Sequence, residues 1–121
     1  MYKRQLRALI QKSIHETADR GSVVIISHAA SFALADRADT LRVLITAPTE
    51  VRVRRTVATD GLDAKHAAKA IHEDDAGRAT YLRKFYGVEM EMLGHYDLLI
   101  NTEKLSPEAI AAVVISAAQG S

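Results

Sequence analysis

Three short apolar runs, separated by segments with helical spacing, constrain the fold of this chain more than any other feature. They are residues 23–26 (VVII), 41–45 (LRVLI) and 96–100 (YDLLI). Nearly continuous apolar strands are typical of a parallel sheet that helices cover on both faces. The sequence therefore predicts an α/β fold, in which a small parallel sheet of three strands is flanked by helices.

Capping residues mark where the helices between these strands begin and end. Four helices are expected: over residues 2–19 before Gly21, from Pro48 to near Gly61, from Asp63 to Gly87 with a break or bend before residue 71, and from Ser106 onward. Asp63 and Ser106 are suitable N-caps because their side-chain oxygens accept hydrogen bonds from the first free backbone N–H groups. Pro48 and Pro107 stand where proline is favoured, at the start of a helix.

The helix over residues 71–87 (IHEDDAGRATYLRKFYG) carries two charges on the stripe that should be apolar. At 3.6 residues per turn its members are Ile71, Asp75, Arg78, Leu82 and Phe85. A buried charge without a partner costs several kcal/mol, about 3–5 when one member of a buried pair is removed. We therefore predict that both charged members are ion-paired or bound to a ligand. Two interpretations remain open, an ordinary pair at i, i+3 and an anion-binding site.

Composition and charge exclude several classes of protein. A chain of 121 residues with 48% hydrophobic and 26% charged residues is expected to fold as one soluble domain, residues 1–121. The net charge of +1 argues against a nucleic-acid partner. There is no cysteine and no apolar run of membrane-spanning length, so we expect no membrane partner and a reducing, cytoplasmic location.

Polar residues follow the predicted strands, at the edge of an open α/β sheet where ligands bind. They are Ser27, His28, Thr46, Asn101 and Thr102. Ser27 and His28 directly follow the first apolar run, and His28 is either a ligand-contacting residue or a structural hydrogen-bonding one. His66 and His72 lie six positions apart and lack the spacing of the zinc motif HExxH, so no metal site is expected.

Arginines gather on one face of the helix that follows Pro48. Arg52 and Arg55 share this face with Thr56 and Thr59, whereas Arg54 points elsewhere. A solvated helix face is the simplest interpretation of this pattern by itself.

Taken in order, these segments resemble the latter part of the cytidylate kinase-like family, which belongs to the phosphate-loop nucleotide kinases. The resemblance rests on VVIIS, LRVLITAP, TEVRVRR, DDAGRATYLRKFYG and YDLLINTEKLSPEA, and it extends over essentially the whole chain. It implies a three-layer fold with a parallel sheet between helices, and a lid whose arginines bind the phosphates of ATP and of a nucleoside monophosphate. By position, Arg52 and Arg55 match the start of that lid, and Asp75, Arg78 and Arg83 match its far side. Guanidinium groups suit phosphoryl oxygens because they bind them through several hydrogen bonds.

The chain also departs from the family pattern. It contains no G-x-x-x-x-G-K-[ST] motif, and in the family the strand and helix that carry this phosphate loop would precede residue 1. ATP and Mg²⁺ are thus implied by the resemblance alone, because that loop holds the β- and γ-phosphates and a metal-binding hydroxyl. Relatives typically have Gly-Arg where this chain has Ser27-His28. We therefore expect a truncated kinase-like domain without catalytic residues of its own.

Two classes of function remain open. In the first, the chain is part of an enzyme that phosphorylates a nucleoside monophosphate, with the phosphate loop supplied upstream or by another chain. In the second, it is a non-catalytic module for nucleotide sensing or oligomerisation. The family strand order places the phosphate-loop strand between the strands matching residues 23–26 and 41–46, so these two must pair with each other or expose their edges. Exposed apolar edges favour pairing between chains, and we expect a homo-oligomer, with a two-fold dimer as the commonest solution.

Overall fold

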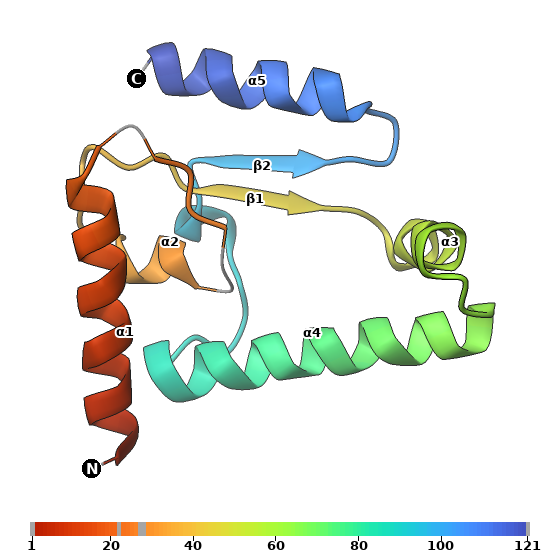
Figure 1. Ribbon diagram of the computed structural model, residues 1–121, viewed down its shortest axis with the longest axis horizontal. Helices are drawn as coiled ribbons and strands as arrows, with labels where there is room; N and C mark the ends of the chain where they lie inside the picture. Colours follow the sequence, from red (N-terminus) through yellow and green to blue (C-terminus); the bar gives the residue numbers. More distant parts are fainter. Residues whose placement is uncertain (1, 22, 27–28, 121) are drawn as a thin grey trace.

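The computed structural model describes residues 2–21, 23–26 and 29–120. Along the chain the elements are α1 (Tyr2–Asp19), α2 (Ala30–Ala33), β1 (Val43–Thr46), α3 (Thr49–Asp60), α4 (Ala64–Tyr86), the 3-10 turn η1 (Leu93–His95), β2 (Leu98–Asn101) and α5 (Pro107–Gly120). Figure 1 shows the strands between α5 on one side and α4 on the other, with α3 beyond the strand ends and α1 across the opposite side of the molecule. The predicted α/β class, with a small parallel sheet flanked by helices, is confirmed.

The sheet has two parallel strands, β1 and β2, in a register that pairs Val43 with Leu98 and Thr46 with Asn101. An ion pair joins the residues just before the two strands, because Arg42 Nη2 lies 3.0 Å from Asp97 Oδ1. The backbone N–H of Arg42 also donates to Asp97 Oδ2 over 2.8 Å. Arg42 and Asp97, the charged residues inside the two predicted apolar runs, therefore join the amino ends of the strands, and each strand begins at the residue directly after its charge.

The predicted strand over residues 23–26 is wrong: these residues form no strand. Val24 is 89% exposed and Ile26 is 95% exposed, so the apolar side chains are not used as strand residues. A strand is stabilised by a ladder of hydrogen bonds to a neighbour and by packing of its side chains, and apolar composition alone provides neither. Among the described residues β1 pairs with β2 alone, so residues 23–26 and β1 do not close on each other.

The predicted helix starts at Asp63 and Ser106 are confirmed at their caps, whereas Pro48 is the N-cap of α3 and not its first helical residue. Asp63 accepts a hydrogen bond of 2.8 Å from the backbone N–H of His66, and the Ser106 hydroxyl accepts one of 3.1 Å from the N–H of Ala109. Gly61 ends α3 with φ of 70°, a left-handed conformation that glycine adopts without strain.

The predicted break or bend before residue 71 is wrong, because α4 runs continuously over Ala64–Tyr86. Its first two turns consist largely of alanine and lysine, which are strong helix formers, and they contain neither glycine nor proline. A single long helix can therefore carry the whole charged stripe past the sheet.

The core is small and lies where α3 and α4 meet each other and where the sheet meets its helices. Its buried apolar residues are Ala29, Ala30, Leu34, Val51, Ala67, Ile71, Leu82, Tyr96 and Ile100. Ile71 and Leu82 belong to the predicted apolar stripe of α4, and Leu82 is only 2% exposed. This packing fixes the rotation of α4 and thereby places Asp75 beside α3 and Arg78 beside the chain that follows α4, with Asp75 half-exposed.

Candidate anion-binding site

A cleft of about 500 Å³ opens between the end of β1, helices α3 and α4, and the chain that follows α4. Its lining residues are Leu44, Ile45, Thr46, Arg52, Asp75, Arg78, Ala79, Leu82, Val88, Glu89, Met90 and Glu91. Ligands in open parallel sheets bind at the carboxyl ends of the strands, and Thr46 is the last residue of β1. The cleft therefore occupies the position at which the fold favours a ligand.

Arg52 of α3 and Asp75 of α4 form a two-point ion pair across the cleft. The two guanidinium nitrogens Nη1 and Nη2 of Arg52 donate to Asp75 Oδ2 and Oδ1, over 2.9 and 2.7 Å. The hydrogen bond from Arg52 lowers the pKa of Asp75 below its usual value, so this carboxylate is charged at neutral pH. The side chains are 34% and 50% exposed, so solvent reaches both members of the pair.

Arg78 of α4 is bound more tightly, to Glu91 and Tyr96. Its Nη2 lies 2.7 Å from Glu91 Oε1, and its Nε lies 3.1 Å from Oε2. Nη2 also donates to the hydroxyl of Tyr96 over 3.0 Å, and that hydroxyl donates a short hydrogen bond to Glu91. The side chains of Arg78 and Glu91 are 27% and 28% exposed. The hydrogen bond from Arg78 lowers the pKa of Glu91, whereas burial, followed by the neighbouring carboxylate, raises the pKa of Tyr96.

The prediction that Asp75 and Arg78 are ion-paired is confirmed, but each binds a partner from another part of the chain. Arg52 lies 23 residues before Asp75, and Glu91 lies 13 residues after Arg78. Sequence reasoning did not identify Glu91 or Tyr96 as part of this site. No helical periodicity connects them to Arg78, because the chain reverses after α4.

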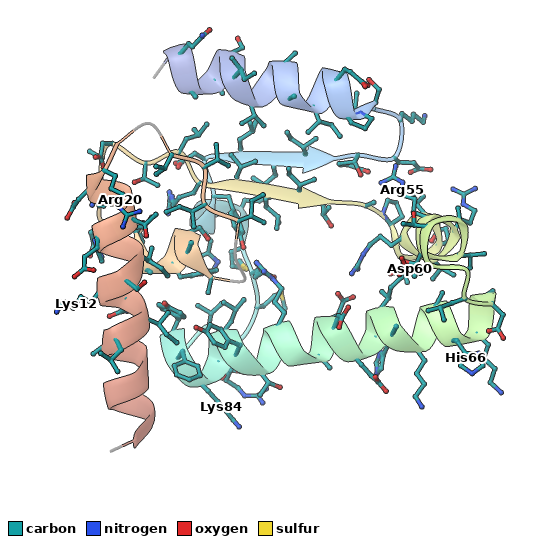
Figure 2. The ribbon with its side chains drawn as sticks, viewed as in Figure 1. Lys12, Arg20, Arg55, Asp60, His66 and Lys84 are labelled. Carbon is teal, nitrogen blue, oxygen red and sulfur yellow. The ribbon has the colours of Figure 1, made fainter. Side chains whose placement is uncertain are left out.

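Arg55, the second predicted lid arginine, lies at the carboxyl end of β2 instead of in the cleft. Its Nη1 donates to the Thr102 hydroxyl over 2.6 Å, and its Nη2 donates to the Thr102 carbonyl over 2.8 Å. Figure 2 shows Arg55 beside the turn between β2 and α5. Thr102 is only 5% exposed, so this arginine satisfies a buried polar residue and fixes α3 against the sheet end.

The remaining predicted site residues are spread over the structure. Thr46 lines the cleft beside Arg52, whereas Asn101 accepts a hydrogen bond from the backbone N–H of Glu103 in the turn after β2. Arg83 is exposed in the last turn of α4 and is not among the residues that line the cleft. Ser27 and His28 lie outside the described residues.

The charges in the cleft nearly cancel, which limits what it can bind. The two guanidinium groups are each neutralised by one carboxylate, and Glu89 adds a further negative charge.

Within residues 2–21, 23–26 and 29–120, no group of three histidine or acidic side chains is placed to hold a metal ion. Nor is any of the described helices both long and apolar enough to cross a membrane.

The family model described as the cytidylate kinase-like family matches residues 1–104. The chain belongs to this family. A cytidylate kinase of Ignicoccus hospitalis is 33% identical over 105 residues, which are 87% of this chain and 60% of the relative. A cytidylate kinase of Staphylothermus marinus is 34% identical over 102 residues, covering 82% of this chain and 55% of the relative. The chain thus spans somewhat more than half the length of these relatives.

A solved structure supports the fold. The crystal structure of an uncharacterized protein from Eubacterium ventriosum matches with a TM-score of 0.81 and 19% sequence identity. The match covers 98% of this chain and 65% of the other. At this identity the likeness concerns the fold alone.

Proposed function

We propose that the cleft between β1, α3 and α4 binds the phosphate group of a nucleotide, through Arg52 and Arg78, as part of a nucleoside monophosphate kinase-like protein. The single observation that carries this proposal is the convergence of two guanidinium groups, from different helices, on one cleft at the end of β1. Membership of the cytidylate kinase-like family supports a phosphorylated ligand. The planar fork of arginine donors suits the oxygens of such a group.

The proposed binding is weak, because both arginines already have carboxylate partners. An incoming phosphate has to share the two arginines with Asp75 and Glu91, or displace these carboxylates from them. We therefore expect dissociation constants on the order of a millimolar, which corresponds to about 4 kcal/mol of binding free energy.

We further propose that the 121-residue chain by itself does not transfer a phosphoryl group. Catalysis of this reaction depends almost entirely on positioning and on neutralising the charge of the phosphates. The sequence has no G-x-x-x-x-G-K-[ST] motif to do this for ATP. When bound, Mg²⁺ would neutralise charge on the β- and γ-phosphates of ATP. The described residues offer it no cluster of ligands, so we assign it no residue of this chain.

The experiment is a titration of the purified chain with CMP, followed by NMR or calorimetry, in parallel with an assay for CDP formation from CMP and Mg-ATP. We expect weak binding that is lost in Arg52→Ala and in Arg78→Ala, and no CDP above background. Arg54→Ala is the matched control, because Arg54 is exposed on the same helix and is not among the cleft-lining residues. Equal binding by the wild type and Arg78→Ala would refute the site. Turnover that is lost in Arg78→Ala would refute the expected inactivity.

A second function, self-association, is favoured by the edge of β1 that faces away from β2, where no strand pairs within residues 2–21, 23–26 and 29–120. Arg42 and Thr46 direct their carbonyl groups toward β2, so by the two-residue period of a strand the backbone groups of Val43 and Ile45 point to the other side. Ile45 is 54% exposed, and β1 itself carries no charge. We propose that two copies of this chain pair along this edge about a two-fold axis, since β1 lacks the charged side chains that commonly prevent pairing between edge strands.

A further inference from the structure

The chain after α4 carries a carboxylate directly to Arg78. Gly87 ends the helix with φ of 67°, and its N–H bonds to the carbonyl of Arg83, while the N–H of Val88 bonds to the carbonyl of Leu82. The bond from Gly87 spans four residues and is the one that defines the αL cap of a helix, and the bond from Val88 spans six and holds the reversed chain against the last turn. Residues 88–91 therefore run back along α4 and bring Glu91 beside Arg78, and all four line the cleft.

Glu91 meets Arg78 in the way that a bound anion would. Two carboxylate oxygens face two guanidinium nitrogens at 2.7 and 3.1 Å, and Tyr96 adds a third hydrogen-bonding group to the same carboxylate. A phosphate group accepts hydrogen bonds from arginine with the same geometry. Glu91 and an external phosphate therefore compete for one set of donors.

We propose that Glu91 is an internal counter-anion of the cleft, which occupies Arg78 when no phosphate is bound and sets the affinity and selectivity of the site. This inference rests on the proposed function of the cleft, because it identifies what controls binding there. The partner that it selects is a multiply charged phosphate oxygen group, which can outcompete a single carboxylate. A ligand that bears only one carboxylate gains nothing by the exchange.

The geometry also assigns Glu91 and Asp75 different parts. The side chains of Arg52 and Asp75 are 34% and 50% exposed, so water and salt screen their attraction. Arg52 can therefore leave Asp75 for a ligand at a small cost in free energy. The Arg78–Glu91 pair is 27% and 28% exposed and shares Tyr96. Release of Arg78 is therefore the step that limits binding.

The test compares binding of inorganic phosphate, and separately of CMP, to the wild type, Glu91→Gln and Glu89→Gln by NMR titration at low salt. Both substitutions remove one negative charge from the same cleft. Of the two residues, only Glu91 is paired with an arginine among the described ion pairs. We expect Glu91→Gln to bind phosphate about 5–10-fold more tightly than the wild type, since a competing charge in direct contact has been removed. Glu89→Gln should change affinity less than about twofold, because its charge acts through solvent.

Glu91→Asp is the second variant, in case Glu91→Gln does not fold. It keeps the charge but shortens the side chain by one methylene, so the two-point contact is weakened, and we expect an affinity between those of the wild type and Glu91→Gln. The CMP arm shows whether the nucleoside adds affinity or whether free phosphate is the preferred source of the anion. Equal gains in Glu91→Gln and Glu89→Gln, or no gain in Glu91→Gln and Glu91→Asp, would overturn the inference while Arg78-dependent binding stands. Absence of phosphate and CMP binding in every variant would overturn the proposed function as well.

Discussion

The ion pair between Arg78 and Glu91 should contribute measurably more to stability than the pair between Arg52 and Asp75. Both are two-point arginine–carboxylate contacts that join segments distant in sequence. They differ in their exposure to water, and Tyr96 forms extra hydrogen bonds with the Arg78–Glu91 pair only. The two pairs therefore allow a comparison, within one protein, between an ion pair that solvent screens (Arg52–Asp75) and one that is partly protected from solvent (Arg78–Glu91).

The structure allows the magnitudes to be worked out. Hydrogen bonds to charged groups contribute about 1.5–3 kcal/mol each, net of the bonds to water that they replace, and exposure to solvent reduces this contribution. With roughly a quarter of each side chain exposed, we expect a coupling free energy of about 1.5–2 kcal/mol between Arg78 and Glu91. For Arg52 and Asp75, where up to half of the side chain is exposed, we expect about 0.5–1 kcal/mol, near the range of surface pairs.

Two double-mutant cycles measure these coupling energies. The first combines Arg78→Met with Glu91→Gln, and the second combines Arg52→Met with Asp75→Asn, each by urea unfolding followed through circular dichroism. The cycle isolates the interaction because the cost of each single substitution cancels. Arg78→Met alone should lower the free energy of unfolding by about 2–3 kcal/mol, since it leaves a largely covered carboxylate without its cation. A coupling at Arg78–Glu91 that is no larger than that at Arg52–Asp75 would refute the reasoning.

Three further results are expected. Gly87→Ala should lower the free energy of unfolding by about 1 kcal/mol, because φ of 67° strains a residue with a Cβ although the space around that Cβ is open; an unchanged urea midpoint would contradict this. The pKa values of Glu91 and Asp75 are lowered in the folded state, so the stability from both carboxylates is present above their unfolded values of 4.5 and 3.8 and is lost as the pH falls through the folded values. Unfolding curves should therefore agree from pH 7 down to about 5.5 and lose stability below about 4.5, and a loss between pH 7 and 6 would point to histidine instead. Sedimentation equilibrium at micromolar concentration should show a dimer that Ile45→Lys dissociates, and a stable wild-type monomer would refute pairing along β1.

Local chemistry made the helices predictable from sequence. The N-caps Asp63 and Ser106 and the C-terminal glycines Gly61 and Gly87 act within four residues of the groups that they satisfy, so their effect can be read from neighbouring letters. The period of the apolar stripe likewise showed which side of α4 is covered. The predicted break in α4 was wrong because the propensity of its first turns outweighs the change in pattern at residue 71.

The strands were less predictable because a strand depends on its neighbour. All three runs are largely apolar, yet within the described part of the chain only two of them pair, and residues 23–26 remain outside the sheet with Val24 and Ile26 in solvent. Hydrogen bonds between strands are formed over long separations, and a single run contains no signal for the presence of its partner.

The sequence by itself determined the α/β class, the helix ends and the fact that two charges on the apolar stripe of α4 need partners. The tertiary structure alone decided which partners they have: Arg52 for Asp75, and Glu91 with Tyr96 for Arg78. It also decided that Arg55 binds Thr102 outside the cleft. The physical reason is that the need of a covered charge for a counter-charge is local and general, whereas the identity of that counter-charge depends on where the chain reverses and on how α3 packs against α4.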